Sequence, residues 1–112
     1  MKRVEKPWGH EIWFAQTERY VGKVLVIEAG KRLSLQYHRV KDESIYVLEG
    51  RLRLTLERDG KLEVEDLEAG EARHIPPGTR HRFEALEHCT LCEVSTPEVE
   101  DVVRLEDDFG RS

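Results

Sequence analysis

The residues in this sequence that are most able to do chemistry are one amide, two imidazoles and one carboxylate, carried by two short motifs. They are Gln36, His38, Glu43 and His81. Imidazole, carboxylate and amide oxygen together suit Zn²⁺, Mn²⁺, Fe²⁺ or Co²⁺ better than Cu⁺. With only these protein ligands, an open coordination position for water or substrate is expected, as in catalytic metal sites. The sequence therefore predicts one divalent metal ion at a site that can also bind a small molecule.

The spacing of these residues indicates how the chain brings them together. Gln36 and His38 are two residues apart, so a β-strand turns both side chains to the same face. Glu43 follows a polar turn and is expected to return on the neighbouring strand, opposite that pair. His81 follows a proline–glycine turn at residues 76–79 that can direct it inward. Each residue alone is an ordinary surface polar group, and the prediction rests on their combination. The other histidines have no partner pattern and are expected to be ordinary: His10, His74 and His88.

The elements that must position these groups are short strands, because helical periodicity is nearly absent and alternation of apolar and polar residues dominates. Asp59-Gly60 is a strong hairpin signal between two of the strands. Many short strands separated by turns indicate an all-β barrel or sandwich. The acidic stretch 97–110 is expected to form one short helix or an ordered arm. The expected strands cover residues 20–27, 32–38, 44–48, 51–57, 61–67, 72–75, 80–85 and 90–95.

Length and composition exclude several classes of function. A chain of 112 residues suits one domain, here residues 1–112. A net charge of −5 argues against nucleic acid as the main partner, because phosphate binding needs a basic face. No apolar run approaches the roughly 20 residues that span a bilayer. No secretory signal is visible, so a cytoplasmic location is expected. Cys89 and Cys92 are expected to be unpaired thiols, because residues three apart on a strand face opposite sides.

On these motifs the sequence resembles the cupin superfamily. Two residue sets carry the resemblance. The first is Gly30, Gln36, His38, Glu43 and Gly50, and the second is Gly70, Pro76, Gly78 and His81. The fold that the resemblance implies is a double-stranded β-helix, or jelly-roll barrel, with the metal inside.

A narrower resemblance is to the mannose-6-phosphate isomerase type, and to the C-terminal isomerase domain of bifunctional phosphomannose isomerase/mannose-1-phosphate guanylyltransferases. It rests on the P-W-G segment at residues 7–9, L-S-L-Q-Y-H at 33–38 and the tail at 101–111. This chain departs from the family pattern at Arg39-Val40, at Ser44-Ile45 after the glutamate, and at Ala85 after the last ligand. The sequence contains no nucleotidyltransferase domain.

The resemblance implies a metal-dependent isomerase that converts mannose 6-phosphate to fructose 6-phosphate, with zinc as the first choice of ion. The catalytic base is not identified, and the candidates are Glu84 or a basic residue near the barrel mouth. A substrate phosphate requires cationic donors. Arg104 and Arg111 in the tail are the first candidates, although each could equally be a surface charge. The other candidates are Lys23, Arg80 and Arg82.

Two alternatives stay open. One is a metal-binding cupin without isomerase activity that acts as a small-molecule sensor or sugar-binding module. The other is an iron-dependent oxygenase, which Gln36 in place of a histidine makes weaker. The C-terminal tail discriminates between the readings, because a tail that folds over the barrel mouth and presents arginines favours a phosphorylated ligand. A homodimer formed through the sheets is expected.

Overall fold

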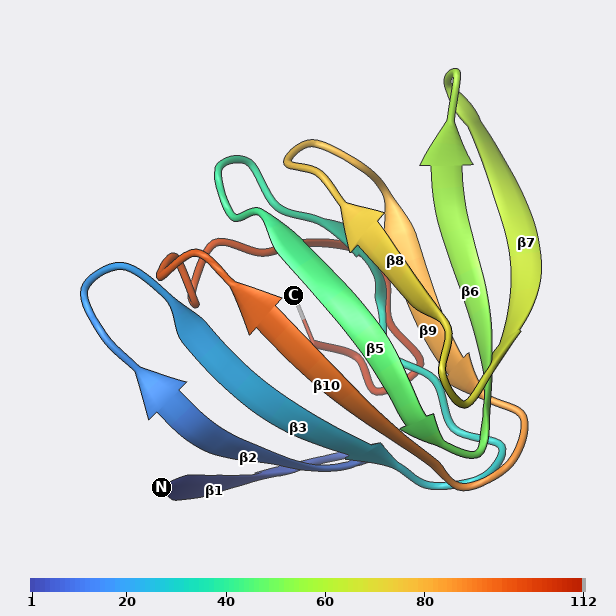
Figure 1. Ribbon diagram of the computed structural model, residues 1–112. Helices are drawn as coiled ribbons and strands as arrows, with labels where there is room; N and C mark the ends of the chain where they lie inside the picture. Colours follow the sequence, from blue (N-terminus) through green and yellow to red (C-terminus); the bar gives the residue numbers. More distant parts are fainter. Residues whose placement is uncertain (112) are drawn as a thin grey trace.

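The computed structural model describes residues 1–111, which form eleven strands and no helix (Figure 1). Because no helix occurs in this range, none is long and apolar enough to cross a membrane. The strands are β1 (Lys2–Lys6), β2 (Gly9–Gln16), β3 (Val21–Ile27), β4 (Leu35–Tyr37), β5 (Glu43–Glu49), β6 (Arg51–Arg58), β7 (Lys61–Glu68), β8 (Ala72–Ile75), β9 (His81–Ala85), β10 (Cys89–Ser95) and β11 (Val103–Glu106).

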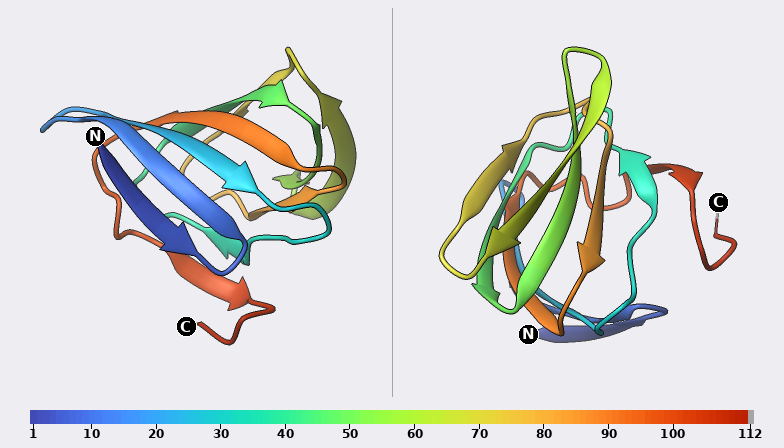
Figure 2. Two further views of the ribbon diagram at one scale, coloured as in Figure 1. Left: turned by 90° about the horizontal axis from the view of Figure 1, so that it is seen from below. Right: turned by 90° about the vertical axis from the view of Figure 1, so that its right-hand side faces the viewer.

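The strands form two antiparallel sheets that face each other as the walls of a jelly-roll barrel (Figures 1 and 2). The first sheet has the order β1-β2-β3-β10-β5-β8, and the second has the order β11-β4-β9-β6-β7. Strands that are neighbours in space are often distant in sequence, as β3 and β10 are. The all-β fold expected from the sequence is therefore confirmed.

The apolar core lies between the two sheets. In β6 the alternation predicted from the sequence is observed, because Leu52, Leu54 and Leu56 are buried while their neighbours are not. The other large core side chains are Trp8, Leu25, Ile27, Ile45, Val47, Leu67, Ile75, Phe83 and Leu91.

Two glycines of the first motif adopt a backbone conformation that favours glycine. Gly30 and Gly50 both have φ of 84°. A Cβ atom on Gly50 would also lie 2.1 Å from the carbonyl oxygen of His88, so a side chain there would clash with backbone. These glycines close the ends of the segment that carries the metal motif. The predicted hairpin at Asp59-Gly60 is also present, with positive φ at both residues.

Three elements differ from expectation. The N-terminal hairpin of β1 and β2 was not predicted, and β4 is shorter than the expected strand at 32–38. The tail at 97–110 contains no helix in its described structure. It is an arm that contributes β11, which pairs with β4. The tail therefore forms part of the second sheet beside Gln36.

Candidate metal centre

Three strands bring the predicted ligands together at one end of the barrel. Gln36 on β4 and His81 on β9 are direct cross-strand partners, and His38 follows β4 by one residue. Glu43 begins β5, which belongs to the other sheet. The expectation that Glu43 returns on the strand next to Gln36 is therefore corrected, because the barrel closes so that Glu43 faces the other three residues from across the interior.

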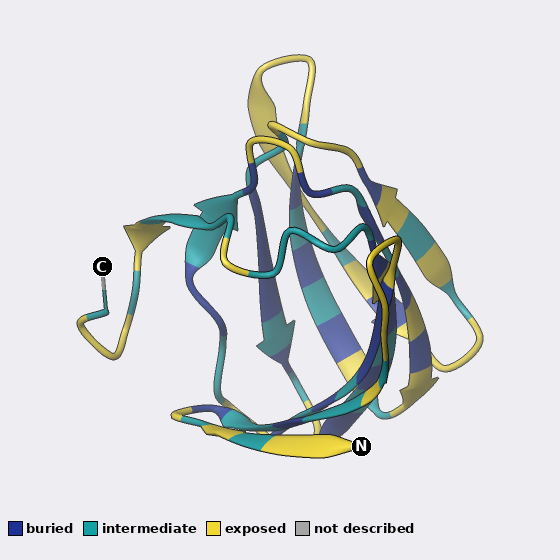
Figure 3. Ribbon diagram, turned by 90° about the vertical axis from the view of Figure 1, so that its left-hand side faces the viewer, coloured by how far each residue is buried: buried dark blue, intermediate teal, exposed yellow. Residues whose placement is uncertain are grey.

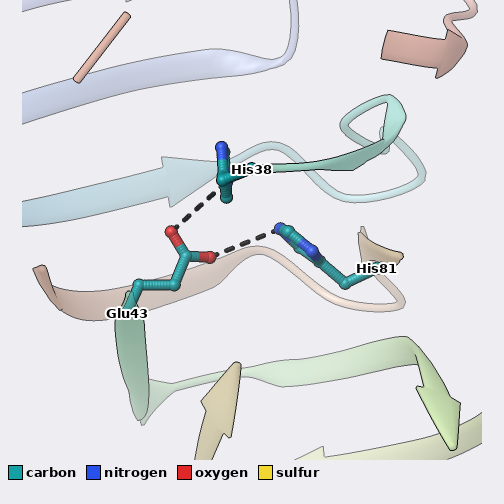
Figure 4. Close-up of side chains that lie close together, drawn as sticks. All are labelled: His38, Glu43 and His81. Carbon is teal, nitrogen blue, oxygen red and sulfur yellow. Dashed lines mark ion pairs between the residues drawn. The ribbon is translucent and has the colours of Figure 1, made fainter. Parts of the chain in front are cut away.

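The distances between three of these side chains match those around a single ion (Figure 4). Oε2 of Glu43 lies 3.5 Å from Nε2 of His38, and Oε1 lies 3.4 Å from Nε2 of His81. One candidate ligand atom from each residue lies within 4.8 Å of the other two, and all three residues are buried. Two atoms that each bind a tetrahedral ion at about 2.1 Å are about 3.4 Å apart. The spacing therefore fits a shared divalent ion.

The hydrogen bonds around the site leave two of the atoms that face its centre without partners. Nδ1 of His81 donates to the carbonyl oxygen of Thr79 at 2.9 Å, and Nδ1 of His38 donates to the carbonyl oxygen of Asp101. Each imidazole therefore presents Nε2 to Glu43. Oε1 of Glu43 and Nε2 of His81 are buried without a hydrogen-bond partner among residues 1–111, whereas Oε2 of Glu43 is paired with Lys41. Such atoms are costly to leave unsatisfied, and a metal ion would satisfy them together.

Gln36 can complete the ligand set by rotation of its amide. Its Oε1 accepts a hydrogen bond from Oγ of Ser34 at 2.6 Å, and its Nε2 lies 3.5 Å from Nε2 of His38. A half-turn of the amide would present Oε1 to the ion, while Nε2 would donate to Ser34. The amide is therefore close enough to become a fourth ligand.

Beside these ligands lies a group of buried charges that the sequence analysis did not assign, apart from Lys23. Nζ of Lys41 is 3.0 Å from Oε2 of Glu43 and 3.3 Å from Oε2 of Glu93. Nζ of Lys23 is 3.5 Å from Oε1 of Glu11. The sequence did contain one signal for Glu93. It lies on the same face of β10 as Leu91, and a charged residue among apolar ones on the inward face of a strand is unusual.

The buried position of these groups shifts their pKa values. Burial raises the pKa of Glu93, and the nearby charge of Glu43 raises it further. Burial lowers the pKa of Lys23. For Lys41, burial acts to lower the pKa, but the charges of Glu93 and Glu43 outweigh it and raise the pKa. For Glu43, burial acts to raise the pKa, but His81, Lys41 and His38 outweigh it and lower the pKa. At neutral pH, Glu43 is therefore a carboxylate, while burial disfavours the charged form of Glu93.

A cavity opens beside Gln36 and His38. It is lined by polar and charged side chains, including those of Gln36 and His38, and by apolar side chains of the core and the tail. The lining residues that matter here are Gln36, His38, Lys23, Lys41, Glu93 and Arg111.

The sequence and fold of this chain are similar to those of known proteins. A family model described as "Cupin domain" matches residues 23–94, a range that includes all four predicted ligands. This chain belongs to the cupin family. The cupin is also similar in structure to KdgF from a Halomonas species, with a TM-score of 0.76 and 21% identity over 90% of this chain and 92% of that one. It is similar to an oxalate decarboxylase from Bacillus subtilis as well, with a TM-score of 0.76 and 20% identity over 92% and 29% of the two chains.

Curated relatives match the cupin over nearly its whole length. Mannose-1-phosphate guanylyltransferase ManC of Salmonella typhimurium is 33% identical over 98% of this chain. Mannose-1-phosphate guanylyltransferase of Escherichia coli is 31% identical over the same share of this chain. The cupin spans only 23% of the length of each of these two proteins. The polyketide synthase CurC of Streptomyces cyaneus is 39% identical, over 60% of this chain and 40% of its own length.

Two of the five cationic residues proposed for phosphate binding line the cavity of the cupin. They are Lys23 and Arg111. Arg111 is held by Asp107, whose carboxylate accepts from Nε at 2.9 Å and from Nη2 at 3.0 Å. Arg104 is half-buried on β11, opposite Gln36 in register, and does not line the cavity.

The remaining candidates do not line the cavity of the cupin. Arg80 pairs with Glu57 and contacts the β6–β7 turn. Arg82 is buried, but its Nε donates to the carbonyl oxygen of Leu33 and its Nη2 to Asp108, so it anchors the tail. Glu84, a candidate base, shares the outward alternation of β9 with Arg82, whereas the buried side chains of His81 and Phe83 face inward.

Proposed function

We propose that this cupin is a metal-dependent isomerase that converts mannose 6-phosphate to fructose 6-phosphate. The observation that carries the proposal is the cavity, which is lined by Gln36 and His38 and by the cationic side chains of Lys23, Lys41 and Arg111. A sugar could thus lie with its reacting carbons at the metal centre and its phosphate toward these cations. The similarity to mannose-1-phosphate guanylyltransferases supports a phosphorylated mannose as ligand.

In the proposed mechanism His38, Glu43, His81 and Gln36 hold the ion, with zinc as the first candidate. A bound divalent ion would act as a Lewis acid that polarises the sugar carbonyl. The donor set of imidazole, carboxylate and amide suits this role because it leaves a coordination position for substrate oxygen.

Glu93 is the proposed base. Aldose–ketose isomerisation moves a proton from C2 to C1 and another from O2 to O1, so it needs no redox partner. The carboxylate of Glu93 would take the C2 proton and return it to C1 of the enediol. Its buried position raises its pKa toward the range in which a carboxyl group both accepts and releases protons efficiently. The ammonium group of Lys41, 3.3 Å away, would orient it.

Proton exchange with solvent tests this function directly. The zinc-loaded chain is incubated with mannose 6-phosphate in D₂O, and NMR follows fructose 6-phosphate and deuterium on its carbon atoms. We expect product from the parent chain and at least a hundredfold slower turnover from Glu93→Gln, within the usual range for loss of a general base. Glu100→Gln, an exposed residue of the tail, is the control. No product from a chain that binds zinc would reject the isomerase.

A second candidate function is a sugar-binding cupin without isomerase activity. One observation favours it: the cations of the cavity already have carboxylate partners, since Lys23 pairs with Glu11 and Arg111 with Asp107. A neutralised cavity suits an uncharged sugar better than a phosphate. Calorimetry with mannose and mannose 6-phosphate separates the two functions, because the isomerase requires much tighter binding of the phosphate ester.

We also propose that the cupin forms a homodimer through the outer face of its first sheet. A row across five strands of that face carries no charge, although 37% of all residues are charged. In a dimer with twofold symmetry the same patch packs against itself, so an uncharged row brings no like charges together. The row consists of Ile12, Val24, Cys92, Tyr46 and Ala72.

A further inference from the structure

The C-terminal tail, residues 97–111, connects the two sheets at the end of the barrel that holds the metal site. It leaves β10 in the first sheet and reaches β11 at the edge of the second, and in Figure 3 it crosses the space between them. Val99, Val102 and Arg111 of the tail line the cavity. The tail is therefore a wall of the proposed site.

One residue of this tail contacts the metal motif from two directions. The carboxylate of Asp101 accepts three hydrogen bonds from consecutive backbone N–H groups, those of Arg39 at 3.1 Å, Val40 at 2.7 Å and Lys41 at 2.9 Å. The backbone carbonyl of Asp101 accepts the hydrogen bond from Nδ1 of His38. Asp101 thus holds both the ligand ring and the loop that follows it.

We infer that Asp101 is a positioning residue for the metal centre, which fixes the imidazole of His38 with Nε2 toward Glu43 and fixes the loop that places Lys41 beside the same carboxylate. The inference rests on the proposed metal site, and it assigns a role to a residue outside the ligand set. A carbonyl that accepts from Nδ1 selects the tautomer whose Nε2 lone pair is free to bind metal. Partners of this kind typically contribute ten- to a hundredfold to metal affinity.

The side chain at position 101 must be a carboxylate for this role. Three N–H donors converge on its two oxygens, and these hydrogen bonds lower the pKa of Asp101 to about 2. An asparagine would keep one acceptor oxygen but would turn an NH₂ group toward one of the donors. An alanine would leave all three N–H groups without this acceptor. The expected order of metal affinity is therefore Asp, then Asn, then Ala.

Asp108 is a matched control in the same tail. Its carboxylate accepts from Arg32 at 2.6 Å and 3.0 Å and from Arg82 at 3.2 Å, so it also anchors the tail. These hydrogen bonds go to Arg32 and Arg82 rather than to His38 or the loop 39–42. Removing it loosens the tail without removing the contact that the inference depends on.

The test measures metal binding by the full chain and needs no substrate. Zn²⁺ affinity is measured by competition with a chelator, and the visible absorption of bound Co²⁺ reports the coordination geometry. We expect Asp101→Ala to weaken Zn²⁺ binding ten- to a hundredfold and to alter the Co²⁺ spectrum. Asp101→Asn should show a smaller loss of Zn²⁺ affinity. It also provides a test if the alanine variant does not fold. Asp108→Ala should stay within about twofold of the parent chain, as expected for an anchor remote from the ligands.

Three results would overturn the inference. The first is parent-like Zn²⁺ affinity in both Asp101 variants. The second is an equal loss in Asp108→Ala, which would make the tail a general structural anchor. The third is failure of the parent chain to bind Zn²⁺ or Co²⁺. The parent chain and the Asp101 variants could show the expected order of metal affinity while the parent chain does not isomerise mannose 6-phosphate. That result would reject the proposed function and leave the role of Asp101 intact.

Discussion

Gln36 and His81 face each other across β4 and β9, and this is the residue pair at which the two strands are in register. The pair places an amide and an imidazole on one wall of the barrel, opposite Glu43 on the other sheet. Because side chains alternate along a strand, a slip of one residue would turn one member of the pair away from the interior. The metal centre therefore depends on this register.

His81→Ala should weaken Zn²⁺ binding at least tenfold while the chain stays folded. The reason is that Nε2 of His81 is one of the buried atoms without a partner, whereas the core is formed by separate apolar residues. Chelator competition measures the affinity, and circular dichroism measures the fold. His88→Ala, at an exposed position, is the control. Unfolding of the parent chain on addition of a chelator would show instead that the metal is structural.

Lys41→Met should destabilise the metal-free chain by about 3–5 kcal/mol, the usual cost of removing one partner from a buried ion pair. The substitution keeps most of the aliphatic stem but leaves Glu43 and Glu93 without the ammonium group between them. Urea denaturation measures the free energy of unfolding. Lys31→Met is the control, because its pair with Glu28 is exposed and should contribute less than about 1 kcal/mol. Equal effects of the two substitutions would contradict the importance of burial.

Arg111→Ala should weaken binding of mannose 6-phosphate about ten- to a hundredfold and leave binding of mannose nearly unchanged. Arg111 lines the cavity, and Asp107 orients its guanidinium group. Isothermal calorimetry with both sugars measures the difference. Arg80→Ala should have no effect, since Arg80 pairs with Glu57 and does not line the cavity. An equal loss for both sugars would assign Arg111 to the structure of the tail.

Asp107 should make the stability of the tail dependent on pH. The hydrogen bond from Arg111 lowers the pKa of Asp107 from 3.8 to about 2. Because the folded chain has the lower pKa, the stabilisation is fully present above about pH 5 and is lost as the pH falls through 4 toward 2. Unfolding free energies of the parent and Asp107→Asn, measured from pH 7 to pH 2, should therefore differ most at neutral pH and converge in acid. A constant difference would mean that the charge of Asp107 is unimportant.

Tyr46→Glu should convert the proposed homodimer to a monomer. Tyr46 is 46% exposed in the uncharged row of the first sheet, so a twofold interface would bring two buried carboxylates close together. Light scattering after size-exclusion chromatography measures the mass. Val64→Glu is the control, because Val64 is 60% exposed on β7 of the other sheet. A parent chain of monomer mass would reject the dimer.

Local pattern in the sequence predicted most of the strands because alternation determines which face of a strand is apolar. Alternation failed at β2, where the buried inward residue is Glu11 and the outward residue is Ile12. On β2 the inward side chain of Glu11 lines the polar cavity, whereas the apolar side chain of Ile12 faces outward. The usual arrangement, with apolar residues inward and polar residues outward, is therefore reversed. On β10 the alternation held, but its inward face includes Glu93 beside Leu91.

The sequence by itself determined the all-β class, the motif glycines and the residues with metal-binding chemistry, because each depends on residue type and short spacing. Only the tertiary structure decided that Glu43 faces the histidines from the other sheet, that Lys41 lies between two carboxylates, and that Asp101 contacts His38. These contacts join segments far apart in the chain. They depend on the order of strands in two sheets and on the closure of the barrel, which no local pattern specifies.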